Sequence, residues 1–237
     1  MDIKKFEETM KRDIEDVFED ILKKFGYVLD IRANARAGAE ISDTLEDEFV
    51  AYFNKNRHPR IYNPESAPKE MTKNPWDIKF NYKYEDYNTG EYFDELVWGD
   101  IKATKNTYND SNPDLGTPTK VINFMLEGHY YLLFILFEYI PTADFKTQFI
   151  TFENSKYVKT VFLKDMNETL RINPKPQFQI NINEDPIYRN KEEFIEMFER
   201  KYNESLDRVI ENANRKRTQI KKQFSDIREL HINNDDE

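Results

Sequence analysis

Two carboxylates and one ammonium group stand at matched positions of a candidate β-hairpin. Asp77 opens its first strand, and Asp100 and Lys102 lie near the end of its second strand. The turn centre near residues 88–89 is almost equidistant from Asp77 and Asp100, so antiparallel pairing returns Asp100 beside Asp77. Asp100 and Lys102 are two residues apart and therefore point to the same face. The spacing predicts that the three groups converge at one edge of a sheet.

This set has a clear use in phosphodiester hydrolysis. Two carboxylates can hold Mg²⁺, which prefers oxygen ligands and keeps water and substrate phosphate in its shell. The metal polarises a phosphodiester and lowers the pKa of a bound water. Lys102 can orient that water or stabilise the charge that develops on phosphorus. The alternative is that Asp77 is a turn or cap residue and that Asp-x-Lys occurs here by chance; the placement on a symmetric hairpin favours the catalytic interpretation.

The composition excludes several other kinds of site. The 237 residues include no cysteine, which rules out disulfide frameworks, thiol catalysis and cysteine-ligated zinc or iron–sulfur sites. The three histidines are scattered, so any metal would be a hard cation held by carboxylates. The charged N-terminal sequence is unlike a signal peptide. The longest apolar run, Tyr130–Phe137, is far shorter than the ~20 residues that span a bilayer. We therefore expect a soluble cytoplasmic protein with no membrane partner.

The charge is unevenly distributed along the chain. The net charge of −10, from 35 basic and 45 acidic residues, counts mildly against nucleic-acid binding. Residues 1–50 carry a net −6, whereas Lys201–Phe224 carries seven basic and three acidic residues, a net +4. A chain of this kind can be acidic outside and basic along one groove.

Hydrophobic periodicity predicts the elements that must position the hairpin. Two amphipathic helices are expected over residues 3–25 and about 38–54, and a loop marked by prolines is expected over His58–Pro68. The hairpin pairs Trp76–Tyr84 with Tyr92–Ala103 around a turn at residues 88–90.

Further elements follow the hairpin. A loop is expected over Asn109–Pro118, and then a short helix over about 119–127 with Val121, Ile122 and Met125 facing inward. The continuous apolar run Tyr130–Tyr139 is typical of a strand buried on both faces. Shorter strands are predicted at Gln148–Phe152, Tyr157–Leu163 and Phe178–Ile182.

A long helix is predicted to close the chain. Asn190 and Glu193 have the spacing of a capping box, and no glycine or proline occurs between residues 191 and 230. Such a length indicates an arm, a partner contact or a helix broken in two. We expect an α/β domain over residues 1–189 and a helical extension with a polar tail over residues 190–237.

Several segments of the chain resemble type II restriction endonucleases of the PD-(D/E)xK superfamily, most closely the SwaI-like group, which includes a blunt cutter of an A·T-only palindrome. The resemblance runs from the first helix to about residue 200, with a tryptophan inserted between the Pro and the Asp of the motif. Its strings are Arg36-Ala37-Gly38-Ala39-Glu40-Ile41-Ser42, Leu45-Glu46-Asp47-Glu48-Phe49, Asn74-Pro75-Trp76-Asp77, Asp110-Ser111-Asn112-Pro113-Asp114-Leu115-Gly116-Thr117 and Arg171-Ile172-Asn173-Pro174-Lys175-Pro176-Gln177. The string Asp100-Ile101-Lys102-Ala103-Thr104 also resembles the EcoRV and HincII branch.

This resemblance implies a restriction-endonuclease-like core, in which helices flank a central mixed β-sheet. It implies an Mg²⁺-dependent homodimer that cuts a palindrome in double-stranded DNA, with catalytic roles for Asp77, Asp100 and Lys102 and metal binding by the two aspartates. Mn²⁺ is expected to substitute for Mg²⁺, and Ca²⁺ to support binding only. A helix before the hairpin often adds a carboxylate in this superfamily, and Glu46 and Glu40 are the candidates, with Glu46 preferred. A cognate methyltransferase would act on the same site without forming a complex.

Polar loops are expected to contact the DNA. Asn and Gln read adenine edges, Thr methyl groups touch thymine methyl groups, and a helix N-terminus can hold a phosphate. Arg32 and Arg36 are candidate phosphate clamps. The other candidates follow the catalytic strand, begin the next helix or alternate along one extended segment: Lys105, Asn106, Thr107, Asn112, Thr117, Thr119, Lys120, Arg171, Asn173, Lys175, Gln177, Gln179 and Asn181. The last group could instead be an Asn/Gln-rich edge strand, and the two arginines ordinary surface residues.

The function predicted from these residues is a type II site-specific deoxyribonuclease with a palindromic, A·T-rich target. A repair or junction-resolving nuclease of the same fold is one alternative, and it would need few residues that read base edges. A catalytically silent DNA-binding protein is the other, and the intact set of Asp77, Asp100 and Lys102 counts against it.

Overall fold

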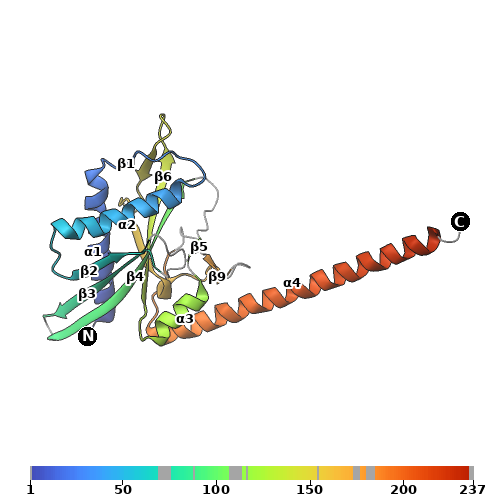
Figure 1. Ribbon diagram of the computed structural model, residues 1–237. Helices are drawn as coiled ribbons and strands as arrows, with labels where there is room; N and C mark the ends of the chain where they lie inside the picture. Colours follow the sequence, from blue (N-terminus) through green and yellow to red (C-terminus); the bar gives the residue numbers. More distant parts are fainter. Residues whose placement is uncertain are drawn as a thin grey trace.

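A central mixed β-sheet forms the body of the molecule (Figure 1). The computed structural model describes residues 2–68, 76–87, 89–106, 114–115, 117–153, 155–172, 177–179 and 185–234. Within these residues the sheet has seven strands in the order β1-β7-β6-β4-β3-β2, with β8 also paired to β6. The strands are β1 (Val28–Leu29), β2 (Ile61–Ser66), β3 (Ile78–Asp86), β4 (Glu91–Lys105), β6 (Tyr131–Pro141), β7 (Thr147–Ile150) and β8 (Lys159–Phe162). Among these described strands β4 and β6 pair in parallel, and the other pairs are antiparallel.

The sheet separates two hydrophobic cores, and the central strand β6 contributes to both. Tyr131, Leu133, Ile135 and Phe137 belong to the core beneath helices α1 (Ile3–Lys24) and α2 (Ala37–Lys55). The intervening Leu132, Phe134 and Leu136 belong to the core beneath α3 (Pro118–Leu126) and the start of α4 (Lys191–Asn234). Side chains of a strand point alternately to opposite faces, so a run with no polar residue is what a doubly covered strand needs. The predicted α/β fold class and this buried strand are confirmed.

The two predicted N-terminal helices are confirmed. Asp2 caps α1 by accepting a hydrogen bond from the Lys5 backbone N–H at 3.1 Å. The buried side of α1 carries the residues that the helical period selects: Phe6, Met10, Ile14, Val17 and Ile21. On α2 the corresponding residues are Ile41, Leu45 and Phe49, all fully buried.

The loop predicted over His58–Pro68 is wrong in its middle, where Ile61–Ser66 forms strand β2. The proline signal misled the prediction because Pro64 lies in a strand at the end of the strand order, where a missing N–H breaks no ladder. The pairing of β2 with β3 is also irregular between Tyr62 and Glu65, and Asn63 has a positive φ of 48°. Pro64 therefore lies within a bulge of an edge strand.

Two further expectations need correction. Most of the loop predicted over residues 109–118 lies outside the described residues, but Asp114–Leu115 forms strand β5, and α3 already begins at Pro118. Arg171 to Asn181 is not one extended segment, because β9 (Arg171–Ile172) and β10 (Phe178–Gln179) pair antiparallel, with Gln179 opposite Arg171. Together with β5 they form a separate small sheet in the order β5-β10-β9. This pairing brings Gln179 beside Arg171, whereas a single extended strand would hold the two residues far apart.

The short helix α3 packs differently from the prediction. Val121 is buried as expected, whereas Ile122 and Met125 are only partly buried. Phe124 lies at the centre of the contact, because its ring stacks on Trp98 with a centroid separation of 3.9 Å.

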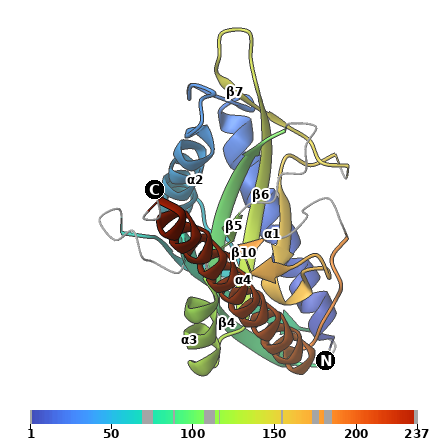
Figure 2. The same cartoon turned by 90° about the vertical axis from the view of Figure 1, so that its right-hand side faces the viewer.

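Helix α4 is a single unbroken helix that projects far from the core (Figures 1 and 2). Its predicted capping box is confirmed: the Asn190 N–H donates to Glu193 Oε2 at 2.8 Å, and the Glu193 N–H donates to Asn190 Oδ1 at 2.9 Å. Only the first part of α4 is anchored, and every described side chain from Leu206 to Glu229 is exposed. In the described part of the chain no helix is both long and apolar enough to cross a membrane.

Candidate active site

The β3–β4 hairpin brings Asp77 beside Asp100, in the register that the sequence spacing predicts. Ile78 pairs with Gly99, and the Asp77 N–H donates to the Gly99 carbonyl at 2.9 Å. The Asp77 side chain then crosses to β4, where its Oδ2 accepts the Ile101 N–H at 2.7 Å. This backbone donor fixes the Asp77 carboxylate at the strand junction, directly before β3 begins.

Lys102 contacts both carboxylates. Its Nζ lies 3.0 Å from Asp100 Oδ1, 2.9 Å from Asp100 Oδ2 and 3.9 Å from Asp77 Oδ2. The side chain of Asp100 is 12% exposed, against 26% for Asp77 and 27% for Lys102. The three groups thus form a compact, partly enclosed cluster that solvent reaches from one side.

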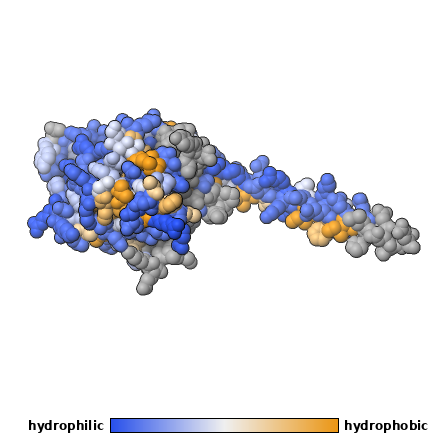
Figure 3. All heavy atoms as spheres, turned by 90° about the horizontal axis from the view of Figure 1, so that it is seen from above, coloured by the Kyte–Doolittle hydropathy of each residue, from blue (hydrophilic) through white to orange (hydrophobic). Residues whose placement is uncertain are grey.

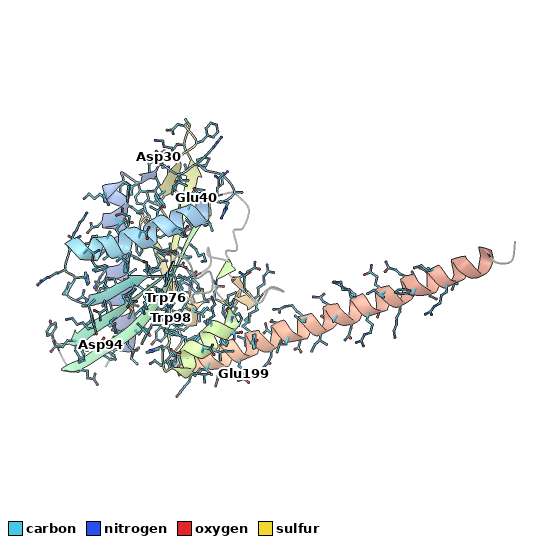
Figure 4. All side chains as sticks on the ribbon, in the orientation of Figure 1. Asp30, Glu40, Trp76, Asp94, Trp98 and Glu199 are labelled. Atoms are coloured by element: carbon cyan, nitrogen blue, oxygen red, sulfur yellow. The ribbon has the colours of Figure 1, made fainter. Side chains whose placement is uncertain are left out.

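The alternation of β4 decides which face of the sheet carries this cluster. Val97 and Ile101 belong to the core beneath α1 and α2, whereas Leu96 and Trp98 pack against the core beneath α3 and α4. Asp100 and Lys102 continue the second series at intervals of two residues, so they lie on the α3 and α4 face. Figure 4 places Trp98 and Trp76, the neighbour of Asp77, near the middle of the molecule.

Burial and neighbouring charges shift the pKa values of the groups in this cluster. Burial, and next the charge of Asp100, raise the pKa of Asp77 to about 6, against the lowering effect of Lys102. Burial acts to lower the pKa of Lys102, but Asp100 and Asp77 outweigh it and the pKa lies above its ordinary value. Lys102 is therefore a cation throughout the physiological range.

Glu46 is the helical carboxyl that the fold brings to the cluster. Burial, then the charges of Asp77, Asp43 and Asp47, raise its pKa to about 8, and Lys102 opposes them. Glu40, labelled in Figure 4, is exposed near the start of α2. Six residues turn a helix by one full turn and about 240° more, so the two glutamates lie on different sides of α2.

Two contacts fix the distance between α2 and the catalytic strand. Ser42 Oγ donates to the Ile101 carbonyl at 3.0 Å. At Gly38 a Cβ would lie 2.4 Å from the Ala103 carbonyl oxygen, so only glycine permits this approach. The resemblance strings contained both residues, but nothing in their spacing indicated this packing role.

Lys120, near the start of α3, belongs to the same electrostatic group. Burial lowers its pKa below the ordinary value, whereas the charges of Asp100 and Asp77 act in the opposite direction. The carboxylates thus face the side of the core that carries α3. The N-cap residue Thr117 makes no side-chain hydrogen bond to the helix.

The donor set fits a hard divalent cation that brings its own water. Asp100 Oδ2 is buried and accepts no hydrogen bond of good geometry, although the Lys102 ammonium lies 2.9 Å away. In the described part of the chain no three His, Asp or Glu side chains form a metal-binding group. Two carboxylates without a full protein cage suit Mg²⁺, which keeps several waters and binds substrate phosphate.

Comparison with known proteins identifies the family to which the chain belongs. A family model described as SwaI restriction endonuclease, SwaI-like, matches residues 2–221. The chain belongs to the SwaI-like restriction endonuclease family. This family is one of type II restriction endonucleases, which are hydrolases that act on DNA. A search of curated proteins found no match.

Solved structures include an NlaIV restriction endonuclease that this chain resembles, with 14% identity and a TM-score of 0.40. The match covers 72% of this endonuclease and 66% of that chain.

The candidate DNA contacts of this endonuclease fall into separate groups. Arg32 is exposed in the segment before α2, and Arg36 is the exposed N-cap residue of that helix. Lys105, the last residue of β4, and Asn106, which follows it, are also exposed. The Asn106 amide donates to Glu138 Oε2 at 2.9 Å. Thr119 is exposed on α3. Thr107, Asn112, Asn173, Lys175 and Asn181 lie outside the described residues.

The small sheet gathers the remaining candidates of this endonuclease. Arg171 and Gln179 line a pocket of about 250 Å³ with Ser205, Arg208 and Asn212 of α4. Gln177 is half-buried beside β10. Arg208 was missed as a candidate, although it lies in the basic segment Lys201–Phe224; no local motif links that helix to the small sheet.

Proposed function

We propose that this restriction endonuclease is an Mg²⁺-dependent, site-specific deoxyribonuclease whose active site comprises Asp77, Asp100, Lys102 and Glu46. The observation that supports this best is the position of the Lys102 ammonium, within 3.0 Å of the Asp100 carboxylate and 3.9 Å from that of Asp77, which directly precedes the neighbouring strand β3. Two acids and one cation on a hairpin are the groups that phosphodiester hydrolysis needs.

Asp77 and Asp100 are the proposed ligands of Mg²⁺, for which Mn²⁺ can substitute. When bound, the ion polarises the scissile phosphodiester and makes a coordinated water more acidic. Asp77 is oriented in advance by the Ile101 N–H, and Asp100 Oδ2 supplies an oxygen that no hydrogen bond occupies. Preorganised ligands avoid reorganisation when the DNA binds.

Lys102 positions the attacking water and stabilises the negative charge that accumulates on the phosphoryl oxygens. Its raised pKa keeps it protonated, so it acts as a cation and not as a general base. The water oxygen bonds to phosphorus as the bond to O3′ breaks, which leaves a 5′-phosphate and a 3′-hydroxyl. Glu46 assists as the third carboxyl, and Glu40 has no part in the reaction.

The proposed target is a palindrome rich in A·T pairs, bound by a homodimer. A two-fold dimer presents one copy of the same surface to each half of a palindrome. The candidate readers are mostly Asn, Gln and Thr, which suit A·T pairs, and arginine, the usual guanine reader, is sparse among them. A central TA step would let the dimer bend the site cheaply. A separate methyltransferase would protect the same site.

The test is to digest a fully sequenced genome and to sequence the ends of the fragments. The proposal predicts one palindromic consensus dominated by A·T pairs, with 5′-phosphate ends. A consensus dominated by G·C pairs would show that the readers are assigned wrongly. Cleavage at branches without a consensus would identify a structure-selective nuclease, and DNA binding without cleavage would identify a catalytically silent protein.

A further inference from the structure

The outer part of α4 is strongly basic in a chain that is acidic as a whole. From Asn212 to Ser225 it carries five basic residues and no acidic one, whereas the net charge of the chain is −10. All of these side chains are exposed. Among the described residues, Arg208, Arg215 and Lys222 form no ion pair. Unpaired cations at this density indicate an anionic partner.

The contacts at the start of α4 define which side of the helix faces the rest of the molecule. Phe194, Phe198, Lys201 and Ser205 are buried, and they recur at alternating intervals of four and three residues. Residues at these intervals share one side of a helix. The same alternation continues outward without a break through Arg208, Asn212, Arg215, Gln219 and Lys222.

From these positions we infer that the side of α4 formed by Arg208, Asn212, Arg215, Gln219 and Lys222, here called the polar side, binds the phosphate backbone of the DNA. This inference rests on the proposed function, since it extends the DNA-binding surface beyond the active site. The polar side runs over 15 residues, and its two ends lie about 21 Å apart, a length comparable to about six base pairs.

The inner end of the polar side already adjoins candidate DNA contacts. Arg208 and Asn212 line the 250 Å³ pocket with Arg171 and Gln179 of the small sheet. Arg208 Nη2 donates to the Ile172 carbonyl at 3.1 Å, which fixes α4 against β9. Arg215 Nη2 donates to Asn212 Oδ1 at 3.0 Å, so neighbouring members are oriented together.

The active-site cluster lies on the same face of the sheet. Asp100 and Lys102 follow Leu96 and Trp98 on the β4 side that α3 and α4 cover. Figures 1 and 2 show the small sheet on the side of the core from which α4 projects. A duplex bound at the hairpin would therefore lie beside the polar side, and the two surfaces can hold one DNA molecule.

A different side of α4 carries exposed apolar residues, seen along one edge of the arm in Figure 3. Val209, Ala213 and Ile220 each follow a member of the polar side by one residue, which turns them about 100° round the helix. Leu206, Phe224 and Ile227 extend this apolar side. Because the two sides are distinct, DNA on the polar side leaves the apolar side uncovered.

The test compares two double variants of the full-length protein that each remove two positive charges from the same stretch. Arg215→Ala with Lys222→Ala alters the polar side, whereas Lys216→Ala with Lys221→Ala alters other sides. Fluorescence anisotropy in EDTA measures affinity for a 40-base-pair duplex that the enzyme does not cut, over a series of salt concentrations. The polar-side pair should weaken binding at least about tenfold and reduce the salt slope by about two, and the control pair should weaken it less than twofold.

Three outcomes would overturn the inference. Equal losses in the two variants would show that only overall charge matters, and no loss in either would show that α4 does not touch DNA. A change in sedimentation coefficient of the polar-side variant without loss of DNA affinity would assign that side to a protein contact. If the wild-type protein cleaves no DNA at all, the proposed function fails instead, and the two failures are thereby distinguished.

Discussion

Glu46 and Asp77 repel each other although they come from different elements, a helix and a strand junction. Their proximity adds to burial in raising the pKa of Glu46 to about 8. The fold thus sets a carboxyl group whose ionised form is disfavoured beside the proposed metal ligands Asp77 and Asp100. Concentrated negative charge of this kind destabilises the protein by itself and favours a divalent cation.

The first prediction concerns stability and pH. The folded protein binds the Glu46 proton more tightly than the unfolded chain, so this contribution to stability is full below pH 4.5 and is lost as the pH rises through about 8. Glu46→Gln should therefore raise the melting temperature at pH 9 in EDTA by a few degrees and leave it unchanged at pH 4.5. Glu40→Gln, on the exposed part of α2, serves as the control. A variant that melts below the wild type at pH 9 would contradict the assigned repulsion.

The second prediction concerns the metal. Cleavage should require Mg²⁺ or Mn²⁺, whereas Ca²⁺ should support specific binding without cleavage because its larger, looser shell misplaces the water. Asp77 must lose its proton before it can bind a metal ion, so the affinity for the metal should rise as the pH increases through about 6. Calorimetric titration with Mg²⁺ and gel assays of cleavage measure the two effects. Undiminished cleavage in excess EDTA would remove the metal from the mechanism.

The third prediction separates chemistry from binding. Lys102→Ala should lower the cleavage rate at least about a hundredfold, since it removes the cation that stabilises the transition state. Asp77→Ala and Asp100→Ala should abolish cleavage and bind DNA as well as the wild type or better, because each removes a negative charge near phosphate. Single-turnover cleavage and equilibrium binding are measured on the same duplex. Wild-type turnover by Lys102→Ala would exclude that residue.

The fourth prediction concerns the contact between α2 and β4. Gly38→Ala places a Cβ against the Ala103 carbonyl, so α2 must move and the protein should lose about 1–3 kcal/mol of unfolding free energy. Moving α2 also moves Glu46, so cleavage should fall while the DNA affinity changes little. Ala39→Leu adds a larger side chain at the exposed neighbouring position and should change neither quantity. Denaturant unfolding and cleavage rates provide the comparison.

The hairpin register was predictable because it depends on local information: two alternating strands and a turn between them fix which residues pair. The choice between Glu46 and Glu40 was harder, since it depends on how α2 lies across β4, and this is set by the close approach at Gly38. Strand β2 was missed because a proline normally argues against a strand, and only the position of β2 at the sheet edge makes Pro64 harmless. The strand predicted at Phe178–Ile182 contains β10, but the small sheet around it was missed because its partners β5 and β9 have two residues each, too few for any periodicity.

The irregular strand β2 has a consequence for how two copies of this protein can meet. An unpaired strand edge is a template on which another chain can add a strand, and native proteins protect their edges against such pairing. Here Pro64 removes a donor, Asn63 turns the backbone into the left-handed region, and the opposite edge strand β1 has only two residues. Among the described residues, neither β1 nor β2 offers a long straight ladder to a second molecule, and the further edge strand β8, which pairs only with β6, has four residues. The geometry of these edge strands therefore disfavours self-association in which two sheets join edge to edge. It also disfavours the fibrous aggregation that grows from such pairing.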